Sequence, residues 1–141
     1  MKLHIETKIE INSSPKKIWD TLINFPNWEK WNPSITKVVG DLKEGNKLYI
    51  EFFQNGKLRK GHPVVLKSDP EKELKWKGSL PIPGLFTGEH YFKIEKISDS
   101  KSLFIHGEYF QGLLISFLFK DPKIVESKYQ MVNESLKKYL E

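Results

Sequence analysis

The sequence has 141 residues, of which 38% are hydrophobic and 13% aromatic, and its formal net charge at pH 7 is +5. A chain of this length and composition can bury a core, which excludes intrinsic disorder and predicts one domain over residues 1–141. Arg59 is the only arginine among 23 basic residues, and the lysines are interleaved with acids, so the charge does not indicate nucleic-acid binding.

Several other classes of protein are excluded or disfavoured. The absence of cysteine excludes disulfides and thiolate chemistry, and the spacing of His4, His62, His90 and His106 does not suit a metal, so we expect neither metal nor cofactor. No apolar segment approaches the ~18 residues of a membrane span, so we expect no stable membrane insertion. The first residues lack the apolar core of a secretion signal, so we expect a cytoplasmic location.

The N-terminal part of the chain predicts one strand and two short helices. Apolar and polar residues alternate over residues 3–11, which is the period of a half-buried strand. Ser14 followed by Pro15 is typical of a helix N-terminus, and this helix is expected to end near residue 24. A single helical turn follows, on which two tryptophans three positions apart share a face: Trp28 and Trp31.

The middle of the chain predicts an antiparallel meander. Asn55-Gly56 is a strong signal for a tight hairpin, because both positions tolerate a positive φ, and Gly61 and Pro63 suggest a bend or an edge. Short turns separate consecutive strands, which is the antiparallel pattern. The strands are expected at residues 35–39, 47–53, 58–66, 73–80, 86–97 and 102–110.

The C-terminal residues predict a long amphipathic helix. Asp121 and Pro122 are typical of a helix start, and apolar residues then recur every three to five positions as far as Leu140. A helix of this length is about 30 Å long and can cross a sheet. Because an antiparallel sheet of this size curls, one helix cannot fill its concave side, and a cavity is expected. The apolar run Leu113–Phe119 should plug its mouth; the alternative is an exposed patch.

The order of these elements resembles the helix-grip fold of the START-like (SRPBCC) superfamily, specifically its polyketide cyclase/dehydrase and lipid-transport branch. The likeness covers essentially the full length and implies an α+β fold. In that fold a curved antiparallel sheet of six to seven strands wraps around a long C-terminal helix, with two short helices after the first strand. It also implies a hydrophobic pocket for lipids, polyketides or other apolar molecules, and does not specify a reaction. The segments that carry it are Ser14–Trp19, Trp28–Pro33, Leu74–Gly78, Gly84–Phe92 and His106–Leu114.

A polar cluster is expected inside this pocket. Strand parity places His90 on the inner face, and the family pattern places His106 and Glu108 there too. A hairpin centred near Asp99 would set His90 across from Glu108. These three residues are candidates for general acid-base catalysis, but the simpler interpretation is that His90 and Glu108 satisfy each other's hydrogen bonds.

The sequence therefore predicts a protein that binds a hydrophobic small molecule, lipid-like or aromatic and polyketide-like. One alternative is a cyclase or dehydratase with His90 and Glu108 as an acid-base pair, and the other is a chaperone-type protein-interaction module. The residues expected to line the ligand site are Trp28, Trp31, Phe52, Trp76, Leu80, Phe86, His90, Phe92, His106, Glu108, Phe110, Val125, Tyr129 and Val132.

Overall fold

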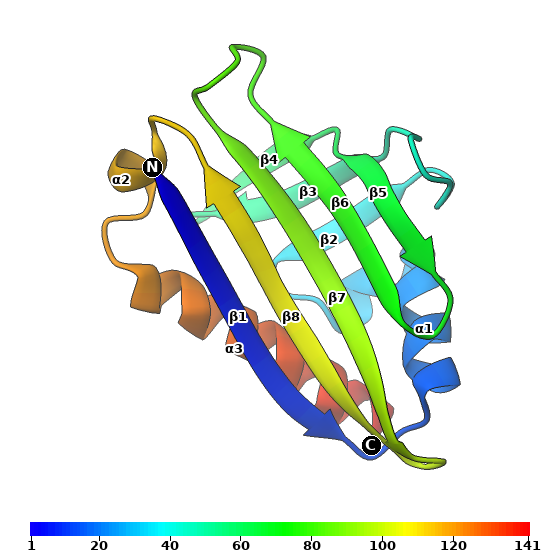
Figure 1. Ribbon diagram of the computed structural model, residues 1–141. Helices are drawn as coiled ribbons and strands as arrows, with labels where there is room; N and C mark the ends of the chain where they lie inside the picture. Colours follow the sequence, from blue (N-terminus) through cyan, green and yellow to red (C-terminus); the bar gives the residue numbers. More distant parts are fainter.

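The computed structural model describes all 141 residues (Figure 1). Its elements follow the order that the sequence predicts, except that one expected strand is divided into two and a short helix is added before the last. They are β1 (Lys2–Ile11), α1 (Pro15–Ile23), the 3-10 helix η1 (Phe25–Lys30), β2 (Ile35–Val39), β3 (Tyr49–Gln54), β4 (Lys57–Gly61), β5 (Val64–Asp69), β6 (Glu73–Ser79), β7 (Thr87–Ser98), β8 (Lys101–Gln111), α2 (Ile115–Leu118) and α3 (Pro122–Leu140).

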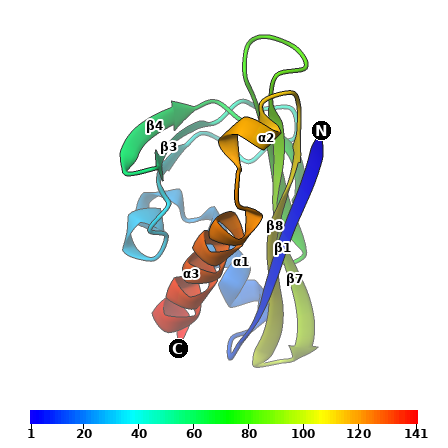
Figure 2. The same ribbon diagram turned by 90° about the vertical axis from the view of Figure 1, so that its left-hand side faces the viewer.

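The strands form two antiparallel sheets. The larger has five strands in the order β1-β8-β7-β6-β5, and the smaller has three in the order β2-β3-β4. Seen from the side, α3 and the smaller sheet lie on the same side of the larger sheet (Figure 2). The arrangement is the α+β helix-grip fold expected from the sequence, with a large antiparallel sheet and a long C-terminal helix.

The local signals in the sequence act as predicted. The side chain of Ser14 accepts a hydrogen bond from the backbone N–H of Lys17, and that of Asp121 accepts one from the N–H of Lys123. Each cap therefore satisfies an N–H group that the first helical turn leaves free. Asn55 and Gly56 have φ angles of 52° and 76°, and they close the hairpin between β3 and β4.

One expected strand, residues 58–66, is divided in the structure. Its first part becomes β4 in the smaller sheet and its second part becomes β5 at the edge of the larger sheet. Pro63 lies between them, has no N–H for a sheet ladder and fixes its own φ, so the chain turns there from one sheet to the other. The Gly61 and Pro63 signal thus marks a sheet boundary.

The apolar side chains pack as two clusters. The main cluster holds 20 buried residues and includes Trp28 of η1, Trp31 just after it, and the buried apolar residues in the C-terminal half of α3. A smaller cluster forms around Ile5, Phe110 and Ile115, and partly buried Phe86, Val125 and Tyr129 pack against it. The fold therefore has one main core and one smaller satellite cluster.

Gly107 permits a close approach on the outer face of the larger sheet. Gly107 pairs with Tyr91 across β7 and β8, and the Tyr91 hydroxyl reaches Glu6 and His4 on β1. A Cβ atom at position 107 would lie 2.4 Å from the Ile5 carbonyl oxygen and 2.4 Å from the Tyr91 hydroxyl. Tyr91 is fully buried although it is on the outer face.

We expect Gly107→Ala to destabilise the fold by about 2 kcal/mol or more, because β1 backbone would have to shift to admit the methyl group. Gly78→Ala is the matched control, since a Cβ atom there meets nothing within 4 Å. Urea unfolding of the two variants measures the difference. Equal stabilities would contradict the packing described for Gly107.

Candidate functional site

A cavity of about 620 Å³ lies between the inner face of the larger sheet, the smaller sheet and the N-terminal half of α3. Of the 29 residues that line it, 14 are hydrophobic. Its apolar walls come from both packing clusters, with Ile50 and Trp76 on one side and Phe110 and Val125 on the other. The volume is within the range of small-molecule sites, which is a few hundred to about 1,000 Å³.

The structure brings most of the expected ligand-site residues to this cavity. They come from strands β3, β6, β7 and β8, from the loop before β7 and from α3. The expected residues that line the cavity are Phe52, Trp76, Leu80, Phe86, His90, Glu108, Phe110, Val125 and Tyr129.

The remaining five expected residues lie behind the cavity wall. Each is almost completely buried, and four of them are apolar side chains of the main cluster. Trp28 packs against Trp31, Trp76 and Phe92, so the aromatic side chains fill this end of the fold. Strand parity identifies which residues face inward, but it does not show how deeply each one is buried. This explains why these five residues were expected to line the cavity and instead lie behind its wall. The five are Trp28, Trp31, Phe92, His106 and Val132.

A polar group interrupts the apolar wall where β7, β8 and α3 meet. The β7–β8 register places His90 opposite Glu108, as the sequence predicts. The Nδ1 atom of His90 is 3.6 Å from Oε1 of Glu108, and the Tyr129 hydroxyl donates a hydrogen bond to the same oxygen. A Cβ atom on Gly88 would lie 2.1 Å from Oε2 of Glu108, so the absence of a side chain there makes room for the carboxyl group.

A chain of hydrogen bonds connects this group to the core. Nε2 of His90 is 2.6 Å from Nε2 of His106, and the two rings are tilted by only 13°. Nδ1 of His106 is 2.8 Å from Oδ1 of Asn133. Asn133 donates from Nδ2 to Oγ1 of Thr7, and the Thr7 hydroxyl donates to the carbonyl oxygen of His106.

Burial shifts the protonation of this site toward uncharged forms. It lowers the pKa of His90 well below its ordinary value, and the neighbouring His106 lowers it further. It lowers the pKa of His106 to about 4, against hydrogen bonds to Asn133 and the Tyr129 backbone that raise it. It raises the pKa of Glu108 to about 7, against the hydrogen bond from Tyr129 that lowers it. Burial disfavours charge in all three groups.

The sequence analysis did not identify two groups of site residues. Thr7 and Asn133 were missed, although Thr7 has the parity of the inward residues of β1 and Asn133 follows Tyr129 by one helical turn. A polar residue on a buried face is a signal that parity and helical spacing can supply. The residues of the other group come from the smaller sheet and from the mouth of the cavity, and their position depends on how the two sheets meet. They are Ile35, Ile50, Lys60, His62, Lys120 and Lys128.

The apolar run before α3 partly closes the cavity and partly faces solvent. Ile115 is buried against Ile5 and Phe110, and Phe119 packs against Phe86 and Phe110. Phe117 lines the mouth and is 69% exposed, and Leu113 is 74% exposed. The two interpretations of this run, a plug and an exposed patch, thus apply to different residues.

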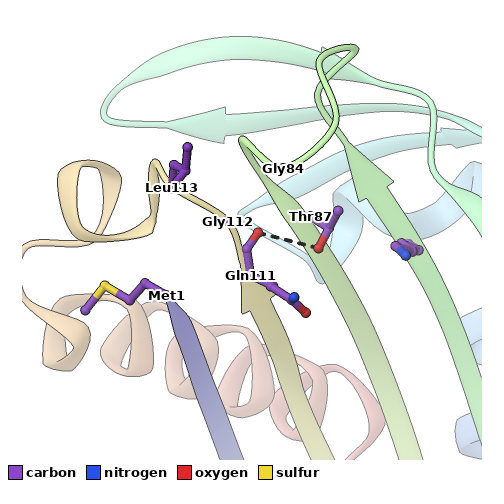
Figure 3. A pocket seen from close by; sticks show the side chains of 7 residues that line it. Met1, Gly84, Thr87, Gln111, Gly112 and Leu113 are labelled. Atoms are coloured by element: carbon purple, nitrogen blue, oxygen red, sulfur yellow. Dashed lines mark hydrogen bonds between the residues drawn. The ribbon is translucent and has the colours of Figure 1, made fainter.

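A second, smaller pocket of about 330 Å³ lies near the start of β1 and the end of β8 (Figure 3). Thr87 and Gln111 form part of its wall and share a hydrogen bond. Lys77 is its one charged side chain and only two of its seven residues are hydrophobic, so it lacks the apolar lining and the acid-base groups of the large cavity. The large cavity is therefore the candidate site.

No group of three or more His, Asp or Glu side chains converges as metal ligands. None of the helices is both long and apolar enough to span a membrane.

Comparison with known proteins agrees with this geometry. The family model described as polyketide cyclase / dehydrase and lipid transport matches residues 2–141. The chain belongs to this family. No protein with a curated description matches the sequence.

Solved structures with the same fold have little sequence in common with this family member. A START superfamily protein from Mycobacterium smegmatis is 14% identical, with a TM-score of 0.75 and coverage of 97% of this chain and 96% of the other. A hypothetical protein from Helicobacter pylori is 18% identical, with a TM-score of 0.81 and coverage of 99% and 88%. An aromatase/cyclase from a Streptomyces species is 10% identical, with a TM-score of 0.70 and coverage of 96% and 94%. At these identities the likeness establishes the fold alone.

The raised pKa of Glu108 predicts a specific pH dependence of stability. The folded state holds the proton up to about pH 7, whereas the unfolded chain releases it near its ordinary value of 4.5. The contribution of Glu108 to the free energy of unfolding therefore falls as pH rises from 4.5 to 7, by up to about 3 kcal/mol, while the buried histidines contribute in the opposite direction. Glu108→Gln cannot ionise, so we expect it to be more stable than the natural protein at pH 8 and about equal at pH 4.5.

Urea unfolding of both proteins at the two pH values measures this difference. The histidines titrate in both proteins, so their effect on stability cancels when the two proteins are compared at the same pH. A Glu108→Gln protein that is less stable than the natural one at pH 8 would show that the buried carboxylate is ionised and well paired.

Proposed function

We propose that this protein binds a hydrophobic small molecule, lipid-like or aromatic and polyketide-like, in the cavity between the sheets and α3. The observation that carries the proposal is the volume and lining of the cavity. About 620 Å³, with hydrophobic side chains at 14 of the 29 lining positions, would hold a molecule of some tens of non-hydrogen atoms. A few polar groups, mainly His90, Glu108 and Tyr129, would fix its orientation.

Family membership supports the proposal without naming the ligand. The family description includes lipid transport, and one structural neighbour is an aromatase/cyclase. Both activities involve apolar molecules. The protein-interaction module considered above would need only a shallow, occluded pocket. A cavity of about 620 Å³ favours a ligand over a protein partner.

The first experiment is native mass spectrometry of the purified protein, followed by organic extraction and identification of any released compound. A protein without a bound compound is then tested by thermal denaturation with a panel of lipids and aromatic polyketides, because a ligand that binds only the folded state raises Tm. The proposal would be contradicted if no compound co-purified and no member of the panel raised Tm.

Gly78→Phe should abolish binding without unfolding the protein. Gly78 lines the cavity on β6, and a Cβ atom there meets open space, so the new ring would enter the volume that the ligand occupies. An aromatic residue also suits a strand better than glycine. We expect affinity for a panel ligand to fall by at least about tenfold while Tm stays within a few degrees.

Gly78→Ala is the matched control, because it changes the same residue and leaves most of the volume free. Isothermal titration of both variants with the same ligand makes the comparison. Unchanged affinity in the Gly78→Phe protein would place the ligand outside this cavity.

A second candidate function is acid-base catalysis on the bound molecule. The observation that favours it is the contact of Glu108 with Tyr129 beside His90, where β7, β8 and α3 meet in the cavity wall. A carboxyl group with its pKa raised to about 7 can both donate and accept a proton near neutral pH. Such a pair could assist enolisation, cyclisation or dehydration of a polyketide-like substrate.

Catalysis makes a prediction that binding alone does not. General acid-base groups contribute about 10²- to 10⁴-fold, so Glu108→Gln and His90→Gln should each lower turnover by at least about a hundredfold while substrate affinity changes little. Product analysis with the ligand identified by extraction measures turnover. Single variants that keep full turnover would remove the enzyme candidate and leave the binding proposal intact.

A further inference from the structure

The hydrogen-bond chain from β1 to the cavity has a single direction, and its origin is Thr7. The Thr7 hydroxyl is 2.8 Å from the carbonyl oxygen of His106, which can only accept, so the one hydroxyl proton must point there. Its oxygen can then only accept from Asn133. This requires the amide nitrogen of Asn133 to face Thr7, at the observed distance of 2.7 Å.

The orientation of Asn133 decides the tautomer of His106. With its nitrogen directed at Thr7, Asn133 presents Oδ1 to Nδ1 of His106 at 2.8 Å. Because an amide oxygen only accepts, Nδ1 of His106 must carry a proton. In a neutral ring the other nitrogen, Nε2, is then an acceptor.

His106 in turn decides the tautomer of His90. The two Nε2 atoms are 2.6 Å apart, so one proton lies between them. Nε2 of His106 is the acceptor, and His90 therefore donates from its own Nε2. The other nitrogen of His90, Nδ1, keeps its lone pair and lies on the side of Glu108.

The gap between His90 and Glu108 leaves both groups available. At 3.6 Å, Nδ1 and Oε1 of Glu108 are too far apart for a hydrogen bond. Oε1 already accepts from Tyr129, so the proton of a neutral Glu108 belongs on Oε2, which lies over Gly88 in the cavity wall. The cavity wall therefore presents a hydrogen-bond acceptor, Nδ1 of His90, beside a hydrogen-bond donor, the protonated Oε2 of Glu108.

We propose that Thr7 and Asn133 are positioning residues that hold His90 in one tautomer, and that the site thereby selects an uncharged hydroxyl group on an apolar ligand. The hydroxyl would donate to Nδ1 of His90 and accept from Oε2 of Glu108. A carboxylate cannot donate and would face the lone pair of His90 without a cation beside it. The inference rests on the proposed binding function and specifies its ligand class as an alcohol or phenol.

The other groups around His90 support this arrangement. Trp76 and Phe92 pack against its ring and do not titrate, and the Tyr129 ring lies parallel to it at 5.4 Å. Burial keeps both imidazoles neutral near pH 7, which the tautomer argument requires. Lys60, Lys120 and Lys128 line the same cavity as exposed residues, and none of them forms an ion pair with Glu108.

The tautomers can be measured directly by ¹H–¹⁵N correlation of the imidazole nitrogens at pH 7. We expect a proton on Nδ1 of His106 and on Nε2 of His90. Thr7→Val retains the shape of the side chain and removes the hydroxyl, so Asn133 can reverse and a second tautomer of both histidines should appear. Thr7→Ser keeps the hydroxyl and should restore the original spectrum. The opposite tautomers in the natural protein, or an unchanged Thr7→Val spectrum, would overturn the positioning role.

Ligand selection is tested with three probes of one shape: 2-naphthol, 2-methoxynaphthalene and 2-naphthoate. We expect 2-naphthol to bind about tenfold more tightly than its methyl ether, the effect of a buried hydrogen bond, and 2-naphthoate to bind least. In Thr7→Val the preference for 2-naphthol should fall, because only the fraction of the protein with the original tautomer presents Nδ1 of His90 as an acceptor, while affinity for the ether stays constant.

The outcomes separate the two proposals. Equal binding of 2-naphthol and its ether would overturn hydroxyl selection and leave the binding function standing. Failure of every probe and of the lipid panel would overturn the binding function and hydroxyl selection together. The tautomer spectra, which need no ligand, would still decide the role of Thr7 and Asn133.

Discussion

Helix α3 is buried in the main cluster through its C-terminal half alone. Val132, Leu136 and Leu140 are buried in the main cluster, whereas Ile124 and Val125 in the first half border the cavity. Because one straight helix cannot follow a curled sheet along its whole length, contact at one end leaves space at the other. The second sheet and the run before α3 enclose that space. The position of the cavity follows from this single constraint.

The polar group in the cavity wall lowers stability in two overlapping pH ranges between about 4 and 7, in opposite directions of pH change. His106 resists protonation in the folded state, so stability is lost as pH falls from 6.5 toward 4. Glu108 resists ionisation, so stability is lost as pH rises from 4.5 to 7. An apolar wall would avoid both costs. Strongly shifted pKa values at one point of a concave apolar surface are typical of sites that act on a ligand.

The hydrogen-bond chain also joins parts of the molecule that are far apart in the sequence. Thr7 is on β1, His90 and His106 are on neighbouring strands, and Asn133 is on the buried half of α3. The buried half of α3, which packs into the main cluster, thus also carries the residue that orients the histidines, Asn133. A shift of α3 would change the hydrogen bonds at the cavity wall, which couples the packing of the core to the chemistry of the site.

The sequence by itself determined most of the elements and the β7–β8 register, because caps, turns and alternation are local signals. Ser14, Asp121 and Asn55-Gly56 act as expected, and His90 lies opposite Glu108. Tertiary structure decided how deeply each inward residue lies. Trp28 and Phe92 are sealed in the core, whereas Trp76 borders the cavity. It also decided the split between β4 and β5 and the partners of Thr7 and Asn133. Parity determines the face of a strand, but depth and hydrogen-bond partners depend on elements that pack from elsewhere in the chain.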